Sequence, residues 1–155
     1  MRLIRFIATP IAAAIAFLVL FFATTHLNTR EGKVQQFYTY ITDKNKSHFT
    51  LDDGTKIILN RNSRFTYSDA YGTDQRKVNL EGEAYFEVTK NRHKPFTIQS
   101  DAMRVRVLGT RFNFKCDKRC RIAEATLIEG EIEVKGNKEE GQIILTPGQR
   151  AELNK

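Results

Sequence analysis

The sequence has little of what catalysis usually requires. Its 155 residues include no tryptophan, three prolines and three histidines, His26, His48 and His93, which lie far apart along the chain. It contains no Gly-x-Ser-x-Gly elbow, no Walker loop and no His-Glu-x-x-His pair, the motifs that would place a nucleophile, a phosphate or a zinc ion. We therefore expect a protein that is not an enzyme, with no cofactor, no metal and no small-molecule substrate.

Cysteine is equally scarce. Cys116 and Cys120 are the two cysteines, and they flank only three residues. Two thiolates need two further ligands to hold zinc, and no histidine or third cysteine lies beside them. Two interpretations stay open: a pair of free thiols in a loop, or a disulfide that closes the tip of a hairpin in an oxidising compartment.

Positive charge is present but not concentrated. The formal net charge is +7, and the longest uninterrupted basic runs are Arg76-Lys77 and Lys118-Arg119. A nucleic-acid-binding protein would show a basic stripe with interleaved aromatic residues. We therefore expect no nucleic-acid partner.

One long apolar run lies near the N-terminus. No formally charged residue occurs between Phe6 and Thr29, and Arg2 and Arg5 precede this run. Its length falls at the short end of what a membrane-spanning helix needs. A cleaved signal peptide and an uncleaved signal anchor are the two interpretations. The poor cleavage site at residues 23–25 favours the anchor. Basic residues remain in the cytoplasm, so the rest of the chain is expected to face outward, in the periplasm.

The remainder of the chain is patterned for strands. From Arg76 to Val88, apolar and polar residues alternate strictly, with Gly82 interrupting the apolar face. Such alternation is typical of strands with one buried face, and the glycine predicts a bulge or a close backbone approach. No segment beyond the apolar run has helical spacing. We predict an all-β domain, either a twisted β-sandwich or a solenoid-like stack of short strands, preceded by one transmembrane helix.

Three local features refine this prediction. The Asp53-Gly54 pair lies between apolar runs and predicts a hairpin with a type I′ turn. After Leu127 the inward parity flips to Ile128, which predicts a bulge with Ile128 facing inward. Residues 80–83 (LEGE) and 128–131 (IEGE) resemble each other and suggest two similar strand-bend-strand units.

Several of these segments, in this order, resemble the periplasmic domain of FecR-type sigma-factor regulators. The matching segments are 51–60 (LDDGTKIILN), 76–88 (RKVNLEGEAYFEV), 94–96 (KPF), 107–113 (VLGTRFN), 126–130 (TLIEG) and 146–151 (TPGQRA). The resemblance implies four regions: a short cytoplasmic end (1–5), a transmembrane signal anchor (6–27), a linker with a first strand (28–47), and a FecR-like β domain (48–153).

The resemblance also implies a function. Members of this family are single-pass inner-membrane proteins that relay the state of a TonB-dependent outer-membrane transporter to an extracytoplasmic-function sigma factor. The implied partners are the transporter's signalling domain and the sigma factor, or a companion regulator chain. Residues 1–5 are too few for a sigma-binding segment, and the chain stops at Lys155 before a second domain, so we expect a truncated or split regulator.

A second hypothesis is an anchored periplasmic scaffold or lipid-handling module. It requires an apolar groove lined by Phe86, Phe96, Phe112 and Phe114, whereas a signalling module requires a filled core and an accessible edge strand.

Overall fold

The computed structural model describes residues 14–22, 35–116, 122–138 and 141–154. By its internal contacts the chain separates into two units, Met1–Val34 and Gln35–Lys155. Residues 14–22 of the first unit are helical, and the described residues contain no helix that is long and apolar enough to cross a membrane. The anchor predicted for 6–27 lies mostly outside the described residues and stays a prediction.

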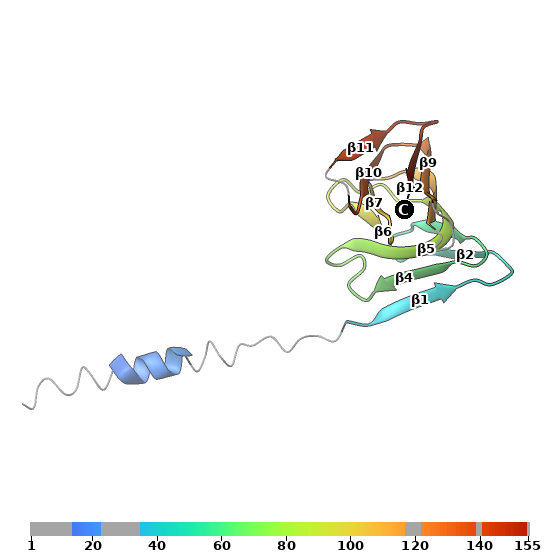
Figure 1. Ribbon diagram of the computed structural model, residues 1–155. Helices are drawn as coiled ribbons and strands as arrows, with labels where there is room; N and C mark the ends of the chain where they lie inside the picture. The colour runs from blue at the N-terminus through green and yellow to red at the C-terminus, as the bar shows by residue number, and fades with distance from the viewer. Residues whose placement is uncertain (1–13, 23–34, 117–121, 139–140, 155) are drawn as a thin grey trace, which may run out of the picture. The chain divides into compact units, whose positions relative to one another are not determined.

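The second unit is built of strands, which confirms the prediction of an all-β domain. The described residues of this unit form β1 (Phe37–Ile41), β2 (Ser47–Thr50), β3 (Lys56–Leu59), β4 (Arg64–Ser68), β5 (Arg76–Glu87), β6 (Phe96–Gln99), β7 (Met103–Val107), β8 (Arg111–Cys116), β9 (Ile122–Glu129), β10 (Ile132–Gly136), β11 (Gln142–Leu145) and β12 (Arg150–Asn154). They form one sheet that closes almost completely around a single core, like a barrel (Figure 1).

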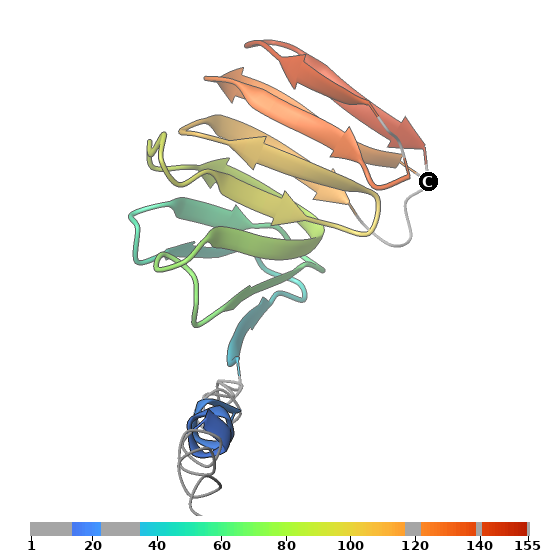
Figure 2. The same cartoon turned by 90° about the vertical axis from the view of Figure 1, so that its left-hand side faces the viewer.

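Strand β5 divides this sheet into two halves. Its first part pairs with β4 and β6, and its second part pairs with β3 and β8. We call the strands β1-β4-β5-β6-β7-β10-β11 half A, and the strands β2-β3-β5-β8-β9-β12 half B. After β5 the chain alternates between them: β6 and β7 lie in A, β8 and β9 in B, β10 and β11 in A, and β12 in B. This alternation produces the layered arrangement in Figure 2.

The bend of β5 lies at Gly82. Every second residue of this strand from Arg76 to Phe86 is buried, as the alternation predicts. Gly82 has a φ of +104°, and a Cβ placed there would lie 2.3 Å from Ser63 Oγ. The predicted close backbone approach is therefore confirmed: Ser63 lies against the backbone of β5, and its hydroxyl accepts a hydrogen bond from Glu83 N at 2.9 Å. A side chain at Gly82 would push Ser63 away from β5.

The space between the halves is filled. Phe86, Phe96, Phe112 and Phe114 are all 0% exposed, and the rings of Phe86 and Phe112 stack with centroids 5.1 Å apart. Burying each such ring contributes about 1.5–3 kcal/mol to folding. These side chains form a closed core and not the wall of a groove, so the arrangement that a lipid-handling module requires is missing from the described residues.

The hairpin of β2 and β3 is confirmed, but its predicted type I′ turn is wrong. Thr50 pairs with Lys56, and the connection between them contains five residues. Within this turn Gly54 alone has a positive φ, +82°. A longer connection needs one left-handed residue and not two, because the remaining residues turn in the right-handed region.

The bulge predicted near Leu127 is also present. Arg111 pairs with Glu129 while the next residue, Phe112, pairs with Leu127, so Ile128 is the additional residue. The prediction that Ile128 faces inward is wrong, since its side chain is 53% exposed. The extra residue of a bulge is left unpaired, and here it turns outward. The inward parity resumes only at Ile132, in half A.

Candidate interaction surfaces

The described residues contain no group of three or more histidine, cysteine, aspartate or glutamate side chains that could hold a metal ion. His48 is exposed on β2, and His93 is exposed on the loop that precedes β6. His26 lies outside the described residues. The histidines that are described do not form a site with each other.

The predicted disulfide is only half described. Cys116 ends β8, is buried, and donates a hydrogen bond from its thiol to Asp101 Oδ1 at 2.8 Å. Burial, followed by the hydrogen bond to Asp101, raises the pKa of the Cys116 thiol. Cys120 lies outside the described residues, so the pairing of these two cysteines stays a prediction.

A buried polar centre lies where the β2–β3 turn meets the start of β5. The carboxylate of Asp53 accepts four hydrogen bonds: from Thr55 N and Thr55 Oγ1 at 3.0 Å each, from Tyr71 Oη at 2.9 Å, and from Arg76 Nη1 at 3.0 Å. Burial raises the pKa of Asp53, but the hydrogen bonds from Thr55, Arg76 and Tyr71 outweigh it and hold the pKa below its ordinary value. The pKa of Tyr71 is raised, because its phenol is buried and lies beside this carboxylate.

Arg76 is the cation of this centre, and only 2% of its side chain is exposed. Besides Asp53, its guanidinium donates to three carbonyl oxygens of the loop after β5: Lys94 O at 2.6 Å, Thr89 O at 2.8 Å and Asn91 O at 3.4 Å. The alternating pattern from Arg76 to Val88 assigned Arg76 to neither face, so its burial was not predicted. Arg76 lies two residues before Val78, on the same face of the strand, and this spacing could have indicated that Arg76 is buried. Because every donor points into the domain, we interpret the Asp53–Arg76 pair as a clamp that fixes two loops.

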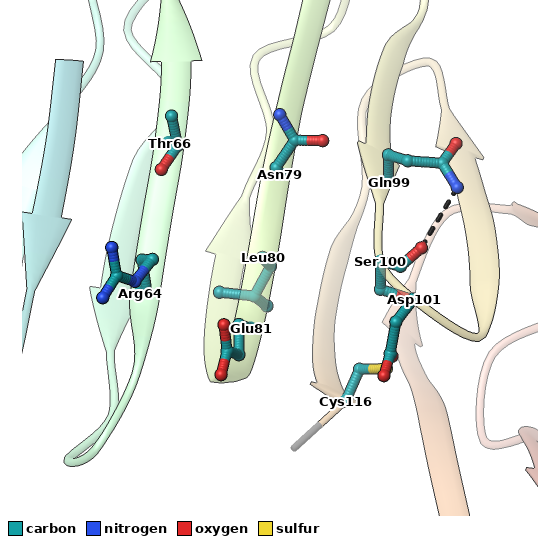
Figure 3. A pocket seen from close by; sticks show the side chains of 9 residues that line it. All are labelled: Arg64, Thr66, Asn79, Leu80, Glu81, Gln99, Ser100, Asp101 and Cys116. Atoms are coloured by element: carbon teal, nitrogen blue, oxygen red, sulfur yellow. Dashed lines mark hydrogen bonds between the residues drawn. The ribbon is translucent and has the colours of Figure 1, made fainter. Parts of the chain in front are cut away.

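A shallow hollow opens on the outer face of half A. It has a volume of about 220 Å³, and Leu80 is the apolar residue of its lining besides Cys116. Figure 3 shows the side chains around it, which come from β4, β5, the end of β6, the β6–β7 turn and the end of β8: Arg64, Thr66, Asn79, Glu81, Gln99, Ser100, Asp101 and Cys116. Gln99 Nε2 donates to Ser100 O at 3.1 Å. This lining can offer hydrogen bonds, and its thiol, Cys116, is buried and donates to Asp101.

Four strands pair on one side only within the described residues: β1, β2, β11 and β12. The edges of β1 and β2 approach each other through the stacked rings of Tyr40 and Phe49, whose centroids are 4.1 Å apart. At the opposite end, Ile143 and Ile144 of β11 are 52% and 57% exposed. An unpaired strand edge with exposed apolar side chains can accept an added strand from a partner.

Comparison with known proteins agrees with the resemblance seen in the sequence. Residues 38–133 match the profile of the family described as FecR protein. Two crystal structures of a candidate anti-sigma factor from Parabacteroides distasonis, at 2.50 Å and 1.65 Å, share 27% sequence identity with the chain and superpose with TM-scores of 0.68 and 0.67. The matches cover 77% and 76% of this chain but only 60% and 59% of those chains. No curated protein matches the sequence.

Proposed function

We propose that this chain, which belongs to the FecR protein family, is an envelope signalling module that helps to control an extracytoplasmic-function sigma factor through protein–protein contacts. The observation that carries the proposal is the family match over residues 38–133, together with the structural similarity to a candidate anti-sigma factor at 27% identity. The filled core and the shallow polar hollow agree with a protein that binds other proteins.

The proposed location is the inner membrane. The uncharged segment from Phe6 to Ala23 would cross it once, with Arg2 and Arg5 in the cytoplasm and the β domain in the periplasm. In that orientation the β domain meets the signalling domain of a TonB-dependent transporter. The signal would then pass to the sigma factor, either directly or through a companion regulator chain.

The proposed mode of contact is strand addition at the edge of β11. Backbone pairing there needs no specialised side chain, and Ile143 and Ile144 would supply apolar contacts on the two faces of the added strand. The edges of β1 and β2 are less suitable, because the stacked rings of Tyr40 and Phe49 lie between them.

Site-specific photo-crosslinking in the native envelope tests this proposal. A photoreactive residue at Ile144 is expected to capture a transporter signalling domain or a sigma-regulator subunit, identified by mass spectrometry. The matched control places the same residue at Thr126, which pairs with strands on both sides in the middle of half B and is expected to capture neither. Recovery of only envelope-assembly proteins from Ile144 would contradict the proposal.

A further inference from the structure

The outer faces of the two halves differ in how their charges are paired. In half B the cations of neighbouring strands lie against acids: Lys56 Nζ–Glu87 Oε2 at 3.7 Å, Arg111 Nη1–Glu129 Oε2 at 3.0 Å, and Arg150 Nη1–Glu124 Oε2 at 3.7 Å. Cross-strand pairs of opposite charge stabilise a sheet. The positive and negative charges of these pairs on this face therefore cancel.

Among the described residues, the outer face of half A is paired less completely. Arg106 is paired, with its Nη1 lying 3.1 Å from Glu133 Oε2. Lys77 on β5, Arg104 on β7 and Lys135 on β10 also point outward, and among the described residues none of these three side chains has an ion pair or a hydrogen bond. Figure 2 shows this half from its outer side, with the strands running from green β5 through yellow to red β11.

Two of the three cations are direct neighbours. Arg104 and Lys135 are cross-strand partners in the β7–β10 pairing. Like charges directly opposite each other destabilise a sheet, so the fold gains nothing from this pair. Because this pair of cations lowers the stability of the sheet, we look for its role in the binding of a partner.

We propose that the strip formed by Lys77, Arg104, Arg106 and Lys135 is a docking surface for an acidic, extended segment of a protein partner. This proposal rests on the proposed function, because it assumes that the partner is a protein. It concerns a sheet face, and not the β11 edge at which strand addition is proposed.

The spacing of the strip suits such a segment. Arg104 and Arg106 lie two residues apart on one strand, about 6.6 Å, which equals the spacing of alternate side chains in an extended peptide. Arg104 also lines a hollow of about 240 Å³, together with Lys77, Thr97 and Gln99. These groups can hold carboxylates and donate to a peptide backbone.

The same face does not suit a glycan or a single-stranded nucleic acid. The outward side chains of β5 in half A and of β6, β7 and β10 include no aromatic ring on which a sugar or a base could stack. An acidic peptide needs no such ring, because charge and hydrogen bonding suffice. The chemistry of the face therefore favours the peptide.

Fluorescence anisotropy on the full chain in nonionic detergent micelles tests this docking surface. The probe is a short labelled peptide of alternating glutamate and serine, with alternating glutamine and serine as its neutral control. Arg104→Gln and Lys135→Gln should each weaken binding about three-fold, and the double variant about ten-fold, as expected for exposed charge pairs. The matched control is Lys115→Gln on half B, which should leave binding unchanged.

The melting temperature gives a second test, because Arg104 and Lys135 place like charges opposite each other. Arg104→Gln and Lys135→Gln should each raise the melting temperature, whereas Lys115→Gln should not, because Lys115 lies opposite Glu83 and Glu124. The proposal is overturned if both variants bind the acidic peptide like the natural chain, or if the neutral peptide binds equally well. It is also overturned if phosphatidylglycerol vesicles bind through Arg104 and Lys135 while the peptide does not. A failure of sigma-factor control in cells would leave this result unaffected.

Discussion

The Asp53–Arg76 clamp makes the sharpest prediction about stability. Asp53→Asn keeps the size of the side chain but removes the charge that compensates Arg76, which is 2% exposed. Removing one partner of a buried ion pair costs about 3–5 kcal/mol, because the other charge stays buried. Three loop carbonyls still accept from Arg76, and Asp53 itself is 15% exposed, so we expect the lower end, about 3 kcal/mol.

The matched control is Glu87→Gln, the same acid-to-amide change in the exposed pair with Lys56, whose side chains are 70% and 35% exposed. Exposed pairs contribute less than about 1 kcal/mol. Urea unfolding, followed by tyrosine fluorescence and by circular dichroism, gives both values. A loss below about 1 kcal/mol for Asp53→Asn, or a loss equal to that of Glu87→Gln, would refute the account of the clamp.

The clamp also predicts a pH dependence. The folded-state pKa of Asp53 lies below its ordinary value, so its stabilisation is present above the unfolded pKa of about 3.9 and is lost as the pH falls through the folded pKa. The difference in stability between the natural chain and Asp53→Asn should therefore be full at neutral pH and shrink in acid. A difference that stays constant down to the acid limit of the fold would contradict this assignment.

The fold makes three further predictions. Gly82→Ala should lower the free energy of unfolding by at least about 2 kcal/mol, since a Cβ would lie 2.3 Å from Ser63 Oγ at a φ of +104°; an unchanged urea midpoint would contradict the close approach. Phe112→Ala should cost about 3–5 kcal/mol in the same assay, and a loss below about 1 kcal/mol would argue against a closed core. Iodoacetamide should label Cys116 slowly in the native chain and rapidly after unfolding, because the thiol is buried and its pKa is raised; rapid native labelling would contradict this, and labelling only after reduction would establish a bridge to Cys120.

Much of the fold could be predicted because one alternating strand dominates the domain. The pattern from Arg76 to Val88 identified β5, its buried face and the special role of Gly82. The similarity between residues 80–83 and 128–131 also had a structural basis. Both glycines in these segments have a positive φ and mark places where the chain passes between the two halves.

Two strands, β4 and β12, were not predicted from the sequence. Strand β4 is short, with Phe65 buried in the core and Tyr67 packed against it, and its pairing with β1 and β5 exists only in the folded domain. Strand β12 follows the turn signal Pro147-Gly148, after which no strand was predicted. Pairing partners that are distant in sequence decide such strands, and local pattern does not reveal them.

The polar features of the surface were the least predictable from sequence. The sequence predicted Asp53 only as a turn residue. In the structure its carboxylate accepts a hydrogen bond from Arg76, which lies 23 residues away in sequence. The position of Arg104 opposite Lys135 likewise depends on the register of β7 and β10. Both depend on pairings between strands that are far apart in sequence.

The measurement that tests the central claim most directly is transcript profiling of the native host with and without this chain. The account predicts that one set of genes, sharing a promoter recognised by an extracytoplasmic-function sigma factor, changes expression when the chain is removed and returns when it is restored. A transcript profile in which no such promoter-sharing set responds would contradict the claim that this FecR-family protein controls a sigma factor.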